Sequence, residues 1–466
     1  MTKTNKNKIF KSLPIIDVGN KSKSIAKSDT GEIVFLDSGV PGDIVDVKTY
    51  KKKKGFFIGN ITKFHKYSKK RTQVKCDHFG VCGGCKWQDI DYKYQLEFKS
   101  NLIKKNLSKI AGIEIDYEIP IIKSIDQYYY RNKLEFSFSN QKWLTKKEIK
   151  SGVEINRNGL GFHKAEMWNK IVDINKCYLQ KEPSNKIRNH IKNYCIKNNL
   201  DFFDHRKKTG LVRGLIIRST LKNDFMLIIQ FCRNEKIIIN KFLTNIKNTF
   251  PEIKSLFYVI NPKQNDTFFD LKVIHFYGKT FISEKMEDLS FKISAKTFYQ
   301  TNSKQAYTLY KIVRDYINPN KIVYDLYSGT GTIALFISKI SQKVIGIDIS
   351  IESINIAKEN AKLNTLQNVI FKSGDIKELL NEELMKIHGK PSIIITDPPR
   401  EGMHIKVIQK IIKIKPNKII YISCNSATQA RDIGLIKDYY KISKIKAIDM
   451  FPQTNHVENV VLLEKK

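Results

Sequence analysis

The stretch Lys321-Ile-Val-Tyr-Asp-Leu-Tyr-Ser-Gly-Thr-Gly-Thr332 decides the fold. Its first six residues form a short, mostly apolar run that is typical of a buried strand, and Gly329 and Gly331 make the turn that follows. A helical pattern begins at Ile333. Strand, glycine turn and helix in this order predict the first unit of a parallel α/β sheet, whose ligands bind at the carboxyl ends of the strands.

Further strands and helices extend this unit toward the end of the chain. Apolar runs separated by helical segments are expected at residues 344–348, 369–371, 392–396 and 418–422. Two more runs, at residues 442–448 and 457–463, are joined only by a loop, which predicts an antiparallel hairpin that closes the sheet. We therefore expect an α/β, Rossmann-like domain over residues 288–466.

The N-terminal region has a different pattern. Residues 1–64 alternate short β-branched runs with turns, which predicts a small β-barrel. Lysines surround Tyr50, and Phe56 and Phe57 follow them, an arrangement typical of contacts with nucleic-acid phosphates and bases. A solvated, Lys-rich hairpin tip would look similar at any single position.

A β-rich central domain is expected between the barrel and the α/β domain, over residues 65–88 and 120–287, with one helix near residues 185–197. Residues 89–119 contain an amphipathic helix that we expect to dock on the α/β domain. Four basic residues alternate with apolar ones on the central strands and are expected to face water or nucleic acid: Arg131, Lys133, Arg213 and Arg218.

The charge of the chain indicates a polyanionic partner. Among the 466 residues, Lys and Arg outnumber Asp and Glu by 82 to 46, which makes the net charge +36. Residues 1–14 are rich in Lys and lack the continuous apolar core of a signal peptide, and no apolar run is long enough to span a membrane. We therefore expect a cytoplasmic protein whose cysteines do not form a disulfide framework.

Three cysteines lie close together in Cys76-Asp-His-Phe-Gly-Val-Cys82-Gly-Gly-Cys85, and Cys177 is the next cysteine along the chain. Thiolate ligands of this kind select zinc or iron–sulfur clusters. The spacing lacks the two separated cysteine pairs of a usual zinc ribbon. A [4Fe–4S] cluster held by these four cysteines is therefore the favoured prediction, with zinc as the alternative.

The sheet carries polar residues where its strands end. Asp348, 17 residues after Gly331, is placed to accept hydrogen bonds from ribose hydroxyls. The run Gly329-Thr-Gly-Thr-Ile-Ala334 also matches a dinucleotide fingerprint, so an NAD or flavin enzyme stays open. Asp397 precedes two prolines after the fourth strand, as in enzymes that methylate nucleobases, although Asp-Pro-Pro is also ordinary turn chemistry.

Four more residues complete the predicted site. Gln300, before the first strand, could bind a methionine-like tail or a uracil edge, and Asp375, after the third, an adenine amino group. Cys424 ends the fifth strand, where it is either a buried thiol or a nucleophile. Glu458 precedes the last strand and comes near Cys424 if the hairpin closes over the sheet, which would supply a general base.

Together these motifs resemble the RNA uracil-5 methyltransferases that depend on S-adenosylmethionine, specifically the 23S ribosomal RNA branch. The resemblance covers nearly the whole chain and implies an N-terminal TRAM-like barrel. It also implies four iron–sulfur ligands (Cys76, Cys82, Cys85 and Cys177), a cofactor site (Gln300, Tyr327, Asp348 and Asp397), Cys424 as the nucleophile and Glu458 as the base. The expected partner is 23S ribosomal RNA with a flipped uridine, bound by a monomer.

The chemistry accounts for this set of residues. The C5 atom of uracil is a weak nucleophile, so addition of the Cys424 thiolate at C6 would activate it for methyl transfer, and Glu458 would then remove the C5 proton. Three alternatives stay open: a transfer RNA uracil-5 methyltransferase, a flavin or NAD iron–sulfur oxidoreductase, and a non-catalytic RNA-binding protein. The transfer RNA branch looks less similar because it is expected to lack both the barrel and the cluster.

Overall fold

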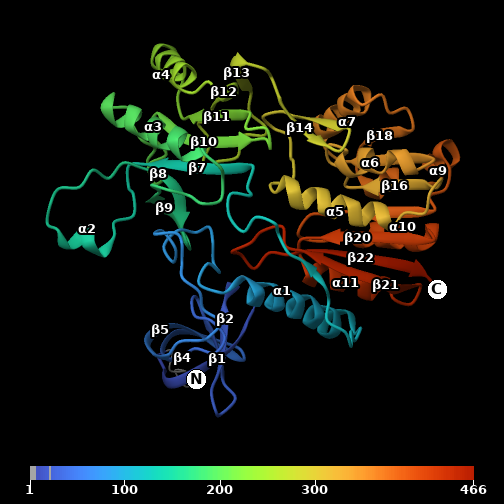
Figure 1. Ribbon diagram of the computed structural model, residues 1–466, viewed down its shortest axis with the longest axis horizontal. Helices are drawn as coiled ribbons and strands as arrows, with labels where there is room; N and C mark the ends of the chain where they lie inside the picture. The colour runs from blue at the N-terminus through green and yellow to red at the C-terminus, as the bar shows by residue number, and fades with distance from the viewer. Residues whose placement is uncertain (1–6, 20–21) are drawn as a thin grey trace.

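The computed structural model describes residues 7–19 and 22–466, so the first six residues of the Lys-rich start lie outside the described part. Figure 1 shows a small barrel in blue, a β-rich region in green and a larger sheet with helices on both sides in orange and red. The fold class predicted from the sequence is confirmed: an N-terminal barrel and a mostly β region precede a Rossmann-like α/β domain. Within the described residues, no helix is both long and apolar enough to cross a lipid bilayer.

The barrel is closed by five strands in the order β1-β2-β3-β5-β4. Their bounds are β1 Ile9–Val18, β2 Ser24–Lys27, β3 Ile33–Leu36, β4 Ile44–Lys53 and β5 Phe56–Lys66. Its interior is apolar, with Val34, Leu36 and Val47 fully buried. Two lysines of β4 lie over aromatic rings: the Nζ atom of Lys52 is 5.1 Å from the ring centroid of Phe57, and that of Lys53 is 5.9 Å from the ring centroid of Phe56.

The central region is built on a seven-stranded sheet in the order β13-β12-β11-β10-β7-β8-β9. The strands are β7 Lys133–Ser139, β8 Gly159–Lys164, β9 Met167–Asp173, β10 Val212–Ser219, β11 Phe225–Phe231, β12 Ile253–Ile260 and β13 Val273–Gly278. The helices are α2 Lys146–Lys150, α3 Ser184–Lys197 and α4 Lys236–Thr249. A separate hairpin, β14 Ile282–Met286 with β15 Leu289–Ile293, leads into the α/β domain.

Two expectations for this region were wrong. Helices α2 and α4 were not predicted; the isoleucines of α4 suggest a strand, yet its buried residues recur at helical spacing: Ile239, Phe242, Leu243 and Ile246. Arg213 and Arg218 do not face water or nucleic acid, because their side chains are buried within β10. Arg213 is retained there by hydrogen bonds to a neighbouring loop, which a sequence pattern does not reveal.

The α/β domain contains an eight-stranded sheet in the order β18-β17-β16-β19-β20-β22-β21-β6. The strands are β6 Ile121–Ile122, β16 Ile322–Leu326, β17 Lys343–Asp348, β18 Val369–Ser373, β19 Ile393–Thr396, β20 Lys418–Ser423, β21 Tyr440–Ile448 and β22 Glu458–Lys465. β16 to β20 are parallel, whereas β22 is antiparallel to both β20 and β21. The predicted hairpin is thus present.

Alternating side chains bury both faces of this sheet. Along β20, Ile420 and Ile422 belong to one core, and Ile419 and Tyr421 belong to the other. One face is covered by α5 Ser303–Asp315, α6 Thr332–Phe336 and α7 Ile351–Leu363. The other is covered by α8 Ile376–Leu379, α9 Glu382–His388, α10 Ile405–Ile414 and α11 Ser426–Ile436. A strand buried on both faces is typical of a doubly wound sheet.

Helix α1 (Tyr92–Asn106), continued by a π-helical turn (Leu107–Ala111), joins the barrel to the α/β domain (Figure 1). The Nζ atom of Lys99 lies 2.6 Å from Oδ1 of Asp449, and both side chains are fully buried. The hydroxyl of Tyr92 donates to the other oxygen of Asp449 at 2.8 Å. Helix α1 is therefore anchored by a buried ion pair to the loop that leads from β21 into β22.

Removal of the Lys99 charge tests this anchor. The change Lys99→Met leaves the Asp449 carboxylate buried without its counter-ion, so we expect the free energy of unfolding to fall by ~3–5 kcal/mol. Urea denaturation measures the effect. The matched control is Lys413→Met, which breaks an exposed ion pair with Glu382 and is expected to cost less than about 1 kcal/mol. Equal losses in the two variants would contradict the anchoring role.

Candidate active site

The predicted site residues meet at one edge of the sheet because of the strand directions. The parallel strands β17, β19 and β20 end at this edge with Asp348, Asp397 and Cys424 at or just after their last residues. Since β22 is antiparallel to β20, its first residue, Glu458, lies at the same edge. The start of β22 thus adds the Glu458 carboxylate at the point where the neighbouring strand β20 ends before the Cys424 thiol.

Cys424 and Glu458 face each other across two paired strands. Ser423 of β20 pairs with Asn459 of β22, so the next positions outward are Cys424 and Glu458. Burial raises the pKa of Glu458 to about 8, with a further contribution from the charge of Asp397. Burial also raises the pKa of the Cys424 thiol to about 11, and both carboxylates add to this shift.

Carboxyl groups with raised pKa values are concentrated at this edge. Burial raises the pKa of Asp397 to about 7. Asp325, in β16, is 1% exposed, and its two carboxylate oxygens have no hydrogen-bond partner. Burial and the charges of Asp397 and Asp348 hold the pKa of Asp325 well above its usual range. The buried hydroxyls of Ser328 and Thr396 also lack partners, so this edge offers free polar atoms to a ligand.

The glycine turn after β16 leaves room at its surface. Gly329 and Gly331 have φ values of +52° and +77°, and a Cβ atom on Gly331 would lie 2.5 Å from the ring of Phe371. A Cβ atom on Gly329 would meet nothing within 4 Å, so that side of the turn is open. The carboxylate of Asp348 holds the turn, because its Oδ2 accepts from the N–H of Gly329 at 2.9 Å.

Three other predicted residues have further structural roles. Tyr327, with φ of +63°, begins the turn, and burial raises its pKa to about 12. Asp375 caps helix α8 by accepting from the N–H of Lys377, and its charge contributes to the pKa shift of Tyr327. Gln300 lies in the loop between β15 and α5, where its carbonyl accepts from the Asn132 amide.

Two residues of this edge were missed by the sequence analysis. Asp325 lies within the first strand, where it was counted only as part of an apolar run. Arg400 follows the two prolines after Asp397, and its positive charge lowers the pKa of both Cys424 and Glu458. The side chain of Asn425 donates to the carbonyl of Arg400 at 2.9 Å, which ties this loop to the residue after Cys424. In the sequence, the signal that could have identified Arg400 is its position directly after the two prolines.

The four predicted cluster cysteines line one cavity of about 360 Å³, together with apolar side chains that include Phe79 and Phe162. Burial raises the pKa of the Cys82 thiol to about 12 and that of Cys177 to about 11. The positive charges of Arg131 and Arg188 lower the pKa of Cys85 and of Cys177, respectively. The cavity therefore gathers four soft ligands beside two cations that favour their thiolate forms.

Sequence comparison identifies the family of the protein. Residues 219–466 match the profile of the family described as tRNA (Uracil-5-)-methyltransferase. An uncharacterized RNA methyltransferase of Bacteroides thetaiotaomicron is 44% identical over 95% of this chain and 99% of its own length. Another, of Porphyromonas gingivalis, is 42% identical over 97% of this chain and 99% of its own length.

The chain belongs to the uracil-5 RNA methyltransferase family. A solved structure of this class, the tRNA (uracil-54, C5)-methyltransferase of Pyrococcus abyssi in complex with S-adenosyl-L-homocysteine, superimposes with a TM-score of 0.75 at 26% identity. The match covers 97% of this chain and 99% of that one. The match therefore includes residues of the N-terminal barrel, which we had expected a transfer RNA enzyme to lack.

The charges around Cys424 predict how fast its thiol reacts. Since Glu458 raises the pKa of Cys424 and Arg400 lowers it, Glu458→Gln is expected to speed alkylation by iodoacetamide at pH 8, and Arg400→Gln to slow it. A shift of one pKa unit changes the thiolate fraction about tenfold, so several-fold changes are expected. Mass spectrometry of the Cys424 peptide gives the rate.

The matched control is Glu464→Gln, at the far end of the same strand, which is expected to leave the rate unchanged. Identical alkylation rates for the wild type, Glu458→Gln and Arg400→Gln would show that these charges do not act on Cys424.

Proposed function

We propose that the protein transfers a methyl group from S-adenosylmethionine to C5 of a uridine in 23S ribosomal RNA, as a monomer in the cytoplasm. The observation that carries this proposal is the placement of Cys424 opposite Glu458, across the strands β20 and β22. A thiol and a carboxylate in adjacent positions supply the nucleophile and the base that methylation of uracil at C5 requires.

In this proposal the Cys424 sulfur forms a bond to C6 of a uracil flipped out of the RNA, and the electron pair of the C5–C6 double bond becomes available at C5. Bound S-adenosylmethionine supplies an electrophilic methyl group. After C5 has taken up this methyl group, Glu458 removes the C5 proton, and the bond between C6 and the Cys424 sulfur breaks. Arg400 favours the thiolate of Cys424 beside the carboxylates.

The polar atoms at the sheet edge fit a cofactor that carries positive charge. The carboxyl groups of Asp348 and Asp397 lie close enough to Asp325 to raise its pKa, and a sulfonium or ammonium group would favour the ionised forms of these groups. The pyrophosphate of NAD or a flavin would add negative charge instead, so this edge disfavours the oxidoreductase alternative. The relative from Pyrococcus abyssi, solved with S-adenosyl-L-homocysteine, supports the same choice.

The proposed cofactor site combines these carboxylates with the turn. Gly329 and Gly331 let the backbone approach the ligand, and Tyr327, Gln300 and Asp375 would contribute side chains around it. Asp348 keeps lone pairs for ribose hydroxyls while it accepts two backbone N–H groups, those of Gly329 and Ser350.

Two substrates are candidates. The motifs of the chain resemble the 23S ribosomal RNA branch, which is why we propose that substrate. Transfer RNA is the second candidate, because the relative from Pyrococcus abyssi is a tRNA (uracil-54, C5)-methyltransferase that covers 97% of this chain. The net charge of +36 suits either RNA.

RNA that contains 5-fluorouridine tests both the mechanism and the substrate. Fluorine at C5 cannot leave as a proton, so the wild type with S-adenosylmethionine is expected to form a stable covalent complex with 23S ribosomal RNA transcripts, visible on denaturing gels. Cys424→Ala is expected to form none. Glu458→Gln is expected to retain a complex with ordinary uridine RNA, because the C5 proton is not removed.

Transfer RNA transcripts that carry 5-fluorouridine are tested in the same assay. A complex with transfer RNA alone would replace the proposed substrate by the second candidate. If the wild type forms no complex with either RNA, or if the complex persists in Cys424→Ala, the covalent mechanism is wrong. Cys195→Ala, a change at a buried cysteine outside the site, is the control for loss of a thiol.

We also propose that Cys76, Cys82, Cys85 and Cys177 hold a [4Fe–4S] cluster. The four cysteines line one cavity, and their spacing along the chain lacks the two separated cysteine pairs of a usual zinc ribbon, which supports a cluster over zinc. Arg131 and Arg188 offset the negative charge that such a centre carries.

Anaerobic purification tests the cluster. The wild type is expected to contain about four iron and four sulfide per chain and to absorb visible light, because each thiolate binds one iron of the cluster. Cys177→Ser is expected to lose most of this iron, whereas Cys232→Ser, outside the cavity, is expected to keep it. Stoichiometric zinc without sulfide would establish the zinc alternative.

A further inference from the structure

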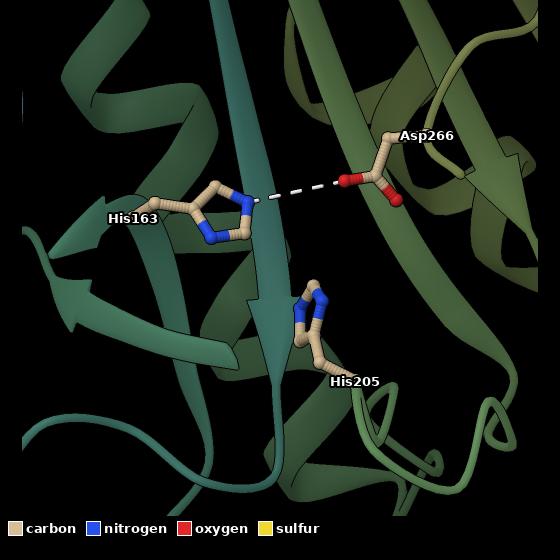
Figure 2. Close-up of side chains that lie close together, drawn as sticks. All are labelled: His163, His205 and Asp266. Atoms are coloured by element: carbon tan, nitrogen blue, oxygen red, sulfur yellow. Dashed lines mark ion pairs between the residues drawn. The ribbon is translucent and has the colours of Figure 1, made fainter. Parts of the chain in front are cut away.

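Three potential metal ligands converge in the central region, away from the catalytic edge and outside the cysteine cavity. His163 lies on β8, His205 in the turn before β10, and Asp266 in the loop between β12 and β13. Their side chains point toward a common space in Figure 2, and one ligand atom from each lies within 4.8 Å of the others. Segments far apart in the sequence thus present two imidazoles and one carboxylate to the same point.

A hydrogen bond from the Nε2 atom fixes the orientation of the His205 ring. Its Nε2 atom lies 2.9 Å from the carbonyl oxygen of Phe138, and a carbonyl can only accept, so Nε2 carries the hydrogen. The lone pair of the neutral ring is therefore on Nδ1. A histidine that donates one N–H to a backbone carbonyl while the other nitrogen stays free has the arrangement seen in metal-bound histidines. The side chain is buried, so this orientation is held by packing.

Asp266 is held by Arg213, whose side chain is itself buried. The Nε and Nη2 atoms of Arg213 donate to Oδ1 of Asp266 at 3.2 and 2.9 Å. The remaining N–H groups of Arg213 donate to the carbonyls of Asn261, Lys263 and Asn265. The charge of the guanidinium is thus distributed over four oxygen atoms, the loop is fixed, and Oδ2 of Asp266 is left available.

The distance between His163 and Asp266 is too long for a direct hydrogen bond. Nε2 of His163 lies 3.9 Å from Oδ2 of Asp266, and its nearest hydrogen-bonding neighbour is the hydroxyl of Ser137 at 3.3 Å. Two ligands that each lie about 2.0–2.1 Å from one metal ion are separated by about 3–4 Å. At 3.9 Å the two atoms form a long ion pair (Figure 2), and the same gap would also admit one metal ion between them.

We propose that His163, His205 and Asp266 bind one divalent transition-metal ion, with zinc as the preferred metal and a water molecule as the fourth ligand. Two imidazoles and one carboxylate form a borderline-soft ligand set that favours such ions over magnesium or calcium. The ion joins β8, the turn before β10 and the loop after β12, so its role is to hold these segments together.

The site also lies next to the cysteine segment, because the N–H of Gly83 donates to the carbonyl of His163 at 3.1 Å. Phe162, the preceding residue on β8, lines the cysteine cavity, whereas His163 points to the opposite face of the sheet. One strand therefore contacts both centres, which makes them neighbours without shared ligands.

Cobalt(II) is the probe that separates the two centres. It substitutes for zinc, and bound by nitrogen and oxygen it gives visible d–d absorption without the thiolate-to-cobalt charge-transfer band that the cysteines would produce. We expect the full-length wild type, with its cysteine centre loaded, to bind one additional Co²⁺ with such a spectrum. Zinc is expected to displace this cobalt and to raise the thermal midpoint of the wild type.

Asp266→Asn is the most conservative variant, because the amide oxygen can still accept from Arg213 and the side chain is exposed. It is expected to weaken Co²⁺ binding at least tenfold, and His205→Ala and His163→Ala are expected to abolish the d–d spectrum. The matched controls are Asp270→Asn, in the same loop region, and His275→Ala, on the exposed side of β13; both are expected to bind cobalt as the wild type does.

Two outcomes overturn the proposal. In the first, all bound cobalt shows thiolate charge transfer, which assigns it to the cysteines. In the second, Asp266→Asn and His205→Ala keep the wild-type affinity and spectrum, which leaves His163 and Asp266 as an ordinary ion pair. Asp266→Asn keeps the proposal testable if His205→Ala does not fold.

Discussion

The reversed direction of one strand is the constraint on which the proposed catalytic edge depends. In a sheet of parallel strands, only carboxyl ends meet at the ligand-binding edge. Because β22 runs antiparallel between β20 and β21, an amino end is added there, and Glu458 comes to lie opposite Cys424. The turn of β21 into β22 therefore has to be held in place. The buried pair of Lys99 and Asp449 holds it, together with Tyr92.

The same loop connects the parts of the molecule. The N–H groups of Lys86 and Trp87, just after Cys85, both donate to the carbonyl of Gln453, and the hydroxyl of Tyr130 donates to the carbonyl of Pro452. The cysteine segment, the central sheet and helix α1 thus all contact the residues that precede Glu458. This arrangement connects the segment of the four cysteines to the proposed catalytic edge, although the cysteines take no part in the proposed chemistry.

The charges at the edge favour a cationic ligand, and they lower the reactivity of the Cys424 thiol by raising its pKa. Buried carboxylates raise one another's pKa, and Arg400 is the cation that opposes them beside Cys424. Such crowding is costly in the free protein, since each charge loses its hydration. It is retained where a bound group of opposite charge offsets the cost, which is the usual pattern of a functional site.

The sequence by itself determined the fold class, the family and most of the residues at the edge, because these follow from local signals: strand periodicity, the glycine turn, Asp-Pro-Pro and the end of an apolar run. The spacing of the cysteines also indicated that four of them are candidate ligands of a metal centre. The sequence failed for helix α4, whose isoleucines have strand propensity, and for Arg213 and Arg218, whose burial depends on distant partners.

Only the tertiary structure decided which side chains meet. The register of β20 against β22 put Glu458 next to Cys424, and the packing of the loop after Asp397 brought Arg400 to them. His163, His205 and Asp266 lie on segments far apart in the chain, and no spacing rule joins them. The physical reason is the same in each case: pKa shifts and ligand sets depend on distances through space, which the order of residues along a chain does not contain.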